Sequence, residues 1–154
     1  PLLQSSAASD VYKRQLINDL VFKAMQDGCL VIYQSHAMRT FIHLNDIARC
    51  FLFAIDNHQS MKNEVYNCGS NDLNFSKKQV CELIKAKTNC YVHYNDYDFD
   101  KDNRDYEVSY EKLSSLGFKV EISLEEGIDE LIAVYNALNF GDKRYQNTAY
   151  PEVF

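Results

Sequence analysis

The spacing of apolar residues predicts an amphipathic helix near the start of the chain. The apolar positions of residues 16–25 recur at steps of one, three and four residues, which is the period of one helix face. They are Leu16, Ile17, Leu20, Val21, Ala24 and Met25. Gly28 follows, and glycine tolerates the left-handed conformation found just past a helix end. The β-favouring runs Cys29–Tyr33 and Thr40–Leu44 then predict two short strands.

A second helix is predicted to begin at Asn45 or Asp46, because either side chain can accept hydrogen bonds from the free N–H groups of a helix start. This helix runs to about Asp56 and is apolar over much of its circumference, so we expect it to be buried on more than one side. The run Glu64–Cys68 predicts another strand, which ends in the turn Asn67–Gly69.

The second half of the chain contains two capping-box sequences. Ser76–Gln79 and Ser123–Glu126 each place a serine three residues before a Gln or Glu, a typical helix start. Between these helices we expect a strand at Tyr91–Tyr94 and a short helix over residues 109–116, closed by Gly117. Short strands mixed with separate helices predict an α/β to α+β fold.

Composition adds limits on the class of protein. The chain has 154 residues, is 46% hydrophobic and 25% charged, and has a formal net charge of −6. That charge argues against a nucleic-acid surface, and no apolar run approaches the length of a membrane span, so we expect a soluble protein. The five cysteines have no C-x-x-C spacing. They form either a metal or disulfide set or, as we expect, small buried or half-buried thiols suited to a reducing cytoplasm.

The ends of the chain differ from the rest. Residues 1–15 lack the layout of a secretory signal, and residues 10–15 resemble one frame of a sequencing adaptor, so we interpret this segment as non-native. Residues 16–138 form the predicted folded region. Residues 139–154 are polar and aromatic without a period and predict a loosely packed tail.

Several residues are candidates for binding or catalysis. Arg39 precedes a predicted strand, where its guanidinium can extend from the edge of the fold and contact phosphate; the alternative is a surface arginine in solvent or an ion pair. Arg104 lies between two acids, which is typical of a surface ion-pair cluster. His43 is better explained as a hydrogen-bonded structural imidazole than as a base, and Asp46 as a helix cap than as an acid.

An acidic loop offers another kind of site. Asp96, Asp98, Asp100 and Glu107 match positions one, three, five and twelve of an EF-hand calcium loop. Lys101 occupies the position where that loop requires glycine, and the preceding residues predict a strand rather than a helix. A calcium-binding module therefore remains an alternative, and we predict no metal site.

Three sequence blocks together resemble a known family. They are Arg39–Ala48, Glu64–Gly69 and Asp102–Ser109, the last followed by Leu116-Gly117-Phe118. In this order and spacing they resemble the C-terminal half of the extended short-chain dehydrogenase/reductases, the NAD-dependent epimerase/dehydratase family, over Leu16 to Leu138. The resemblance implies the end of a Rossmann domain plus a small mixed α/β substrate-binding domain, with the N-terminal Rossmann half missing.

The same resemblance implies a function for the parent enzyme. It would be a cytoplasmic homodimer that uses NAD bound by the missing half and acts on a nucleotide-diphosphate sugar. Arg39 would contact the diphosphate, and Arg104 would close on the phosphate or ribose side of the nucleotide. Phe41 would lie near the base or sugar, and Asn67 would line the pocket. Thr40 stands where the family more often has an acid.

The cofactor-binding signature is missing from this sequence. It has no Gly-x-Gly-x-x-Gly turn, and the Tyr-x-x-x-Lys spacing occurs only at Tyr97–Lys101, inside the acidic loop, so we predict no catalytic or cofactor-binding residue and expect the chain alone to be inactive. A non-catalytic nucleotide-binding regulator on the same fold is a further alternative.

Overall fold

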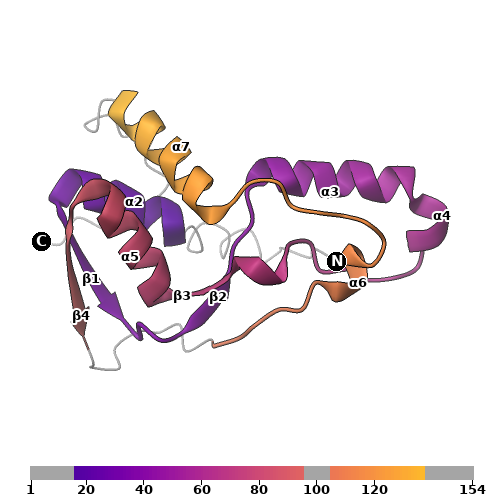
Figure 1. The fold of residues 1–154 in the computed structure, drawn as a ribbon, viewed down its shortest axis with the longest axis horizontal. Helices are drawn as coiled ribbons and strands as arrows, with labels where there is room; N and C mark the ends of the chain where they lie inside the picture. The colour runs from indigo at the N-terminus through magenta and orange to yellow at the C-terminus, as the bar shows by residue number, and fades with distance from the viewer. Residues whose placement is uncertain (1–15, 96–104, 138–154) are drawn as a thin grey trace, which may run out of the picture.

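The computed structural model describes residues 16–95 and 105–137. Its elements in chain order are α2 (Leu16–Asp27), β1 (Cys29–Tyr33), β2 (Met38–Thr40), α3 (Leu44–Asp56), α4 (His58–Met61), η1 (Asn71–Leu73), β3 (Asn74–Ser76), α5 (Lys77–Thr88), β4 (Tyr91–Asn95), α6 (Glu111–Ser114) and α7 (Leu124–Ala137). Figure 1 shows α2, α5 and α7 gathered near β1 and β4 at one end, with α3, α4 and α6 at the other. The mixed α/β fold predicted from the sequence is confirmed.

Two strand pairs organise the described residues. β1 and β4 are parallel, with Cys29 opposite Tyr91 and Tyr33 opposite Asn95. Parallel neighbours need a long crossover connection, and here it contains β2, α3, α4, η1, β3 and α5. β2 and β3 are antiparallel, with Arg39 opposite Phe75. This second pair therefore lies between the two groups of helices (Figure 1).

The main core lies among α2, α5, α7 and the β1–β4 pair. Its fully buried members are Val21, Val80, Cys81, Ile84 and Ile128, each with no exposed surface. Val21 is one of the apolar positions predicted for the first helix. Burial of this many aliphatic side chains stabilises the group, because each contributes about 1.5–3 kcal/mol when removed from water.

Local signals at the helix ends are also confirmed. The Ser76 hydroxyl accepts from the Gln79 amide at 3.2 Å, and the Gln79 side chain accepts from the Ser76 amide at 2.7 Å. Ser123 and Glu126 form the same reciprocal pair, with distances of 3.2 and 2.8 Å. Gly28 has a φ of 64°, the left-handed conformation predicted after α2.

A smaller cluster supports one side of α3. Met61, Leu113 and Phe118 are buried in it. Three side chains of α3 pack against them, namely Cys50, Phe53 and Ala54. The Phe53 and Phe118 rings meet edge to face at 5.5 Å. The prediction that α3 is buried on more than one side is wrong, because most of its other apolar side chains have no cover among the described residues. Phe51, Leu52 and Ile55 are 70, 61 and 70% exposed.

The start of α3 also differs from the prediction. The capping residue is His43, whose Nδ1 accepts from the Asn45 amide at 3.2 Å, so neither Asn45 nor Asp46 is the cap. His43 Nε2 lies 3.0 Å from Glu130 of α7, which confirms its structural role. Asp46 is instead fully buried and accepts from the Glu121 and Ile122 amides at 3.1 and 3.0 Å. It thereby joins α3 to the segment before α7.

Two strand predictions are wrong, because one strand lies at different residues and the other does not form. The strand expected at Thr40–Leu44 is instead β2, Met38–Thr40. Its partner β3 extends no further than Asn74, which lies opposite Thr40. Residues 64–68 form no strand, since no ladder partner lies beside them within the described residues. The short helix expected over 109–116 is confined to Glu111–Ser114, and Gly117 follows with a φ of 100°.

None of the helices within residues 16–95 and 105–137 is both long enough and apolar enough to cross a lipid bilayer.

Candidate functional site

The segment 105–110 lies along the β2–β3 pair and is fixed by side-chain hydrogen bonds. The Asn74 side chain of β3 donates to the Val108 carbonyl at 3.0 Å and accepts from the Val108 amide at 3.2 Å. At one end the Met38 amide of β2 donates to the Asp105 carboxylate at 2.8 Å. At the other the Asn71 side chain accepts from the Tyr110 amide at 2.9 Å. Side chains thus satisfy backbone groups that a third strand would otherwise satisfy.

The other sequence blocks meet the same segment. The Asn67 side chain donates to the Ser109 carbonyl at 3.1 Å. The hydroxyls of Thr40 and Tyr110 are 2.5 Å apart. Residues from β2, from the 67–74 stretch and from 105–110, far apart in sequence, are therefore in direct contact.

Gly69 allows Tyr110 to occupy its buried position. The Tyr110 ring is 5% exposed, and burial raises the pKa of its hydroxyl. A Cβ at residue 69 would lie 2.6 Å from a ring carbon, closer than real side chains pack, and Gly69 has a φ of 154°. The glycine of the predicted Asn-x-Gly turn is therefore required here by close approach of a ring.

Arg39 lies in β2 beside this segment and is buried. Its side chain is 7% exposed, so it neither reaches out from the edge of the fold, as predicted, nor resembles a solvated surface arginine. Nη1 donates to the Met38 carbonyl at 2.7 Å, and the guanidinium lies 5.7 Å from the centre of the Tyr106 ring. A guanidinium keeps its charge when buried, so this position holds a fixed positive charge next to the 105–110 segment.

The other predicted binding residues lie in different surroundings. Phe41 is half-buried, packs against the main core, and donates its amide to the Leu73 carbonyl at 3.0 Å. Asn67 is exposed and bonded to the Ser109 carbonyl. Arg104 lies outside the described residues, as do Asp96, Asp98 and Asp100 of the acidic loop. The described part of the chain contains no group of three or more His, Cys, Asp or Glu side chains placed to hold a metal ion.

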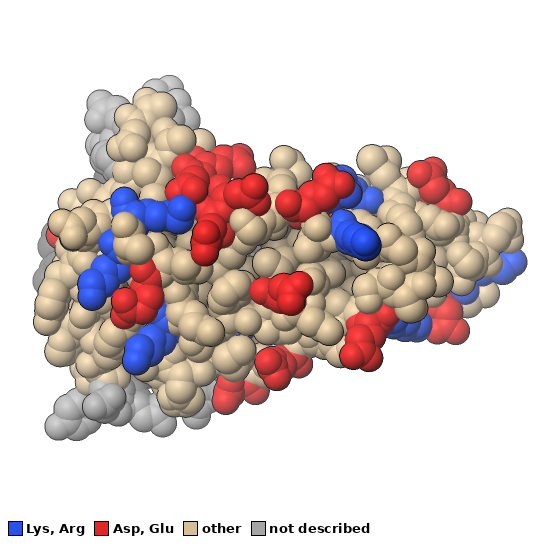
Figure 2. Space-filling model, viewed as in Figure 1, with Lys and Arg blue, Asp and Glu red and all other residues tan. Residues whose placement is uncertain are grey.

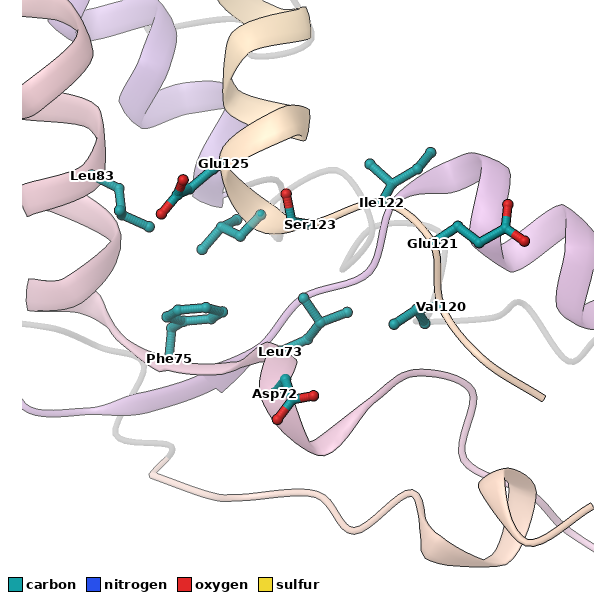
Figure 3. Close-up of a pocket in the computed structure, with 10 residues that line it drawn as sticks. Asp72, Leu73, Phe75, Leu83, Val120, Glu121, Ile122, Ser123 and Glu125 are labelled. Carbon is teal, nitrogen blue, oxygen red and sulfur yellow. The ribbon is translucent and has the colours of Figure 1, made fainter. Parts of the chain in front are cut away.

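A cavity of about 440 Å³ opens between η1, α5 and the start of α7. In Figure 3, Phe75 and Leu83 lie on one side of it and Leu73 and Val120 on the other, while Glu121 points away toward α3. Asp72, Glu121 and Glu125 are the ionisable side chains that line it. Figure 2 shows acidic side chains where α7 begins and over η1. Because this lining contains carboxylates and no Lys or Arg, the cavity does not suit a diphosphate.

The described residues do not fit a bound dinucleotide either. Such a cofactor requires a glycine-rich turn between a strand and a helix, with backbone close to the pyrophosphate. β1 is followed by Gln34, Ser35 and His36, and nothing lies within 4 Å of a Cβ placed on Gly28 or Gly117. No step of cofactor chemistry can therefore be assigned to this part of the chain.

The five cysteine side chains differ in how far they are buried. Cys81 and Cys90 are buried, Cys50 and Cys68 half-buried, and Cys29 is exposed, so the prediction holds for all but Cys29; none is in a disulfide. Burial raises the pKa of Cys81 to about 12, and burial together with a hydrogen bond shared with Cys50 raises the pKa of Cys68 to about 12. Neither is an activated nucleophile, because the thiolate is the reactive form.

Comparison with known proteins shows which proteins this chain is similar to. The model of the NAD dependent epimerase/dehydratase family matches residues 8–69. The chain resembles this family, as predicted. The match covers the Arg39 block and begins inside residues 1–15, which lie outside the described residues.

Three relatives illustrate the similarity. The mouse dTDP-D-glucose 4,6-dehydratase is 30% identical over 107 residues, covering 63% of this chain and 29% of that protein. The solved Helicobacter pylori ADP-L-glycero-D-manno-heptose-6-epimerase superposes with a TM-score of 0.65 at 19% identity, covering 84% of this chain and 41% of its own. The Thermus thermophilus UDP-glucose 4-epimerase complex with NAD gives 0.61 at 15% identity, covering 79% and 40%.

These comparisons establish the fold. At such low identity the solved structures show a shared fold and no shared residue roles. The chain spans less than half the length of the relatives it matches. The relatives are enzymes whose names specify nucleotide sugars, and the predicted α/β fold of an epimerase/dehydratase is confirmed.

Sequence reasoning missed several residues that build this region. Asn71, Asn74 and Asp105 hold the 105–110 segment, and Thr40 and Tyr110 join it to β2. Only Gly69 had a usable signal, the turn sequence at residues 67–69. The asparagines had none, since their partners lie 34 and 39 residues away in sequence.

Proposed function

We propose that this chain is the nucleotide-sugar-binding portion of a longer NAD-dependent enzyme of the epimerase or dehydratase type. The family similarity supports the reaction class, and the relatives' names support a nucleotide sugar as substrate. In this proposal Arg39 contacts the diphosphate, Phe41 and Asn67 lie near the bound nucleotide sugar, and the chemistry takes place on the rest of the parent enzyme.

The contact between the first and third sequence blocks is the observation that supports a phosphate site at Arg39. Asp105 accepts from the Met38 amide, one residue from Arg39, and Tyr106 lies over the guanidinium. Arg104 directly precedes Asp105, so we propose it as the second phosphate contact. Two arginines on separate segments suit the spread charge of a diphosphate, since each can form charge-assisted hydrogen bonds to its oxygens.

The role of these residues is placement of the substrate. Binding energy gained at a diphosphate, away from the reacting sugar, can hold the sugar in a reactive position. Tyr106 is 40% exposed and covers the guanidinium, so we expect its ring to respond when an anion binds.

Titration of the chain with UDP-glucose, UDP and uridine tests the proposal. The chain has eleven tyrosines and no tryptophan, so tyrosine fluorescence reports binding. We expect Arg39→Gln to weaken UDP binding at least tenfold, as loss of about 1.4 kcal/mol would do, and to leave uridine binding unchanged because uridine has no phosphate. Lys87→Gln, whose lysine pairs with Asp129 between α5 and α7, is the control.

Two outcomes would contradict this function. Equal UDP affinity for Arg39→Gln and the unaltered chain, both with native circular dichroism, would remove the phosphate role. A native reading frame upstream of Leu16 without a Tyr-x-x-x-Lys sequence would favour the non-catalytic regulator instead.

A further inference from the structure

The cavity between η1, α5 and the start of α7 combines an apolar lining with carboxylates. Its apolar residues are all buried or half-buried, namely Leu73, Phe75, Leu83, Val120, Ile122 and Leu124. The cavity volume of about 440 Å³ lies within the range of small-molecule pockets, about 300–1,000 Å³. An aromatic side chain therefore has room to enter, and its burial against these residues would be favourable.

Two carboxylates of the cavity have no positively charged partner in the described part of the chain. Asp72 accepts a hydrogen bond from the Ser70 hydroxyl at 3.5 Å, and Glu125 is exposed at the start of α7. Figure 3 shows these two side chains on opposite sides of the cavity. The third carboxylate, Glu121, is already paired with Arg49. An occupant that combines an aromatic ring with positive charges therefore suits this cavity.

The sequence after α7 contains a segment with this chemistry. Lys143 and Arg144 are its only cations, and Tyr145 follows them directly. The next tyrosine is Tyr150, but Glu152 lies two residues beyond it and would bring an acid to an acidic rim. The three residues 143–145 are therefore the part of this sequence that complements the cavity in both charge and apolar character.

The chain after α7 is also long enough to return to the cavity. The first residue of α7, Leu124, lines the cavity, and the helix runs away from it to Ala137 (Figure 1). Its 14 residues span about 20 Å at 1.5 Å per residue. Tyr145 is eight residues beyond Ala137, and an extended chain covers about 26 Å over that number of residues. The segment can therefore reach the cavity by running back along α7.

We propose that Lys143–Tyr145 docks in this cavity. The Tyr145 ring packs against Phe75 and its apolar neighbours, and the two cations pair with Asp72 and Glu125. The docked segment joins η1, α5 and α7 from outside, because the cavity lies between these elements. This inference concerns the packing of the chain itself and does not depend on the proposed function.

Docking at η1 has a consequence for the candidate binding site. Asp72 is the neighbour of Asn71, whose side chain accepts from the Tyr110 amide at 2.9 Å. Two residues further on, the Asn74 side chain bonds the same segment, 105–110. A segment bound at Asp72 would hold η1 in place, and its release would loosen the residues that lie beside Arg39.

Site-specific photocrosslinking in the 154-residue chain tests this contact. Tyr145→p-benzoylphenylalanine places a crosslinker in the proposed segment, and Tyr150→p-benzoylphenylalanine is the control. We expect crosslinks from position 145, within one chain, to peptides that contain residues 72–83 or 120–125, and none there from position 150. Crosslinks joining two copies, equal crosslinks from both positions, or none to these peptides would overturn the proposal. Crosslinks from Tyr12, which also adjoins two cations, in place of Tyr145 would overturn it too.

Trypsin cleavage after Arg144 gives an independent measurement on the unlabelled chain. Docking protects this bond, so the cleavage rate follows the population of the undocked form. We expect Asp72→Asn with Glu125→Gln to accelerate cleavage roughly threefold or more, as loss of two exposed ion pairs would do. Asp27→Asn with Asp56→Asn makes the same change in charge at exposed positions at the ends of α2 and α3, and should leave the rate unchanged. Equal rates in the two double variants would contradict the pairing.

Discussion

Replacing Asp46 with asparagine tests whether a buried carboxylate joins α3 to the segment before α7. One oxygen, Oδ1, accepts from Arg49 at 2.6 Å and from the Glu121 amide at 3.1 Å, and Oδ2 accepts from the Ile122 amide at 3.0 Å. Asparagine has the same shape but one acceptor oxygen. Its NH₂ group would face the Ile122 amide or the guanidinium, and two donors cannot satisfy each other.

The size of the effect follows from these contacts. A buried amide left without an acceptor costs about 1–3 kcal/mol, and a hydrogen bond to a charged group contributes about 1.5–3 kcal/mol. The Arg49 side chain is 36% exposed, so water screens part of the ion pair. We therefore expect Asp46→Asn to lower the free energy of unfolding by about 3 kcal/mol. For a chain of this size that lowers Tm by roughly 6–12 °C.

Urea and thermal unfolding, followed by circular dichroism, measure this change. Asp129→Asn is the control, because Asp129 pairs with Lys87 at 2.6 Å but is 59% exposed. An exposed pair contributes about 1 kcal/mol or less, so the control should change Tm little. If Asp46→Asn loses no more stability than Asp129→Asn, the carboxylate does not join α3 to the segment before α7.

Three further changes probe other parts of the fold. Gly69→Ala should lower the free energy of unfolding in urea by about 1–3 kcal/mol, because its methyl group would overlap the Tyr110 ring. Gly117 also has a positive φ but has open space around it, so Gly117→Ala should cost less. Equal losses in the two variants would exclude the overlap. Ser123→Ala should lower the free energy of unfolding by about 1 kcal/mol through loss of the α7 cap, and no change in Tm would contradict this. Burial raises the pKa of Cys81 to about 12, so the thiol ionises at a lower pH in the unfolded chain than in the folded one. The free energy of unfolding should therefore fall as pH rises from about 9 toward 12. An equally steep decline in Cys81→Ala would exclude this cause.

The parts of the fold that the sequence predicts well are those determined by near neighbours. α2, α5 and α7 follow helical apolar periods, and their caps lie within three residues of the groups they bond. β1 and β4 are short β-branched runs next to helix ends. Such patterns are visible in sequence because the chemistry acts over one or two turns.

Features that depend on distant partners were not predictable in the same way. Asp46 has the sequence position of a cap, but its partners lie 75 and 76 residues away. The apolar pattern of α3 predicts buried faces without showing which face the described residues cover. Arg39 lies on a short strand whose bounds are set by β3, so its burial under Tyr106 could not be inferred from the residues around it.

The parallel pairing of β1 with β4 has a consequence for how this chain reaches its fold. Residue 29 pairs with residue 91, and everything from β2 to α5 lies within the loop that this pairing closes. The entropy of closing so long a loop must be met before the strands contribute contacts, so such topologies fold slowly. Helices α3 and α5 form their hydrogen bonds between near neighbours, so we expect them to form before the two strands pair.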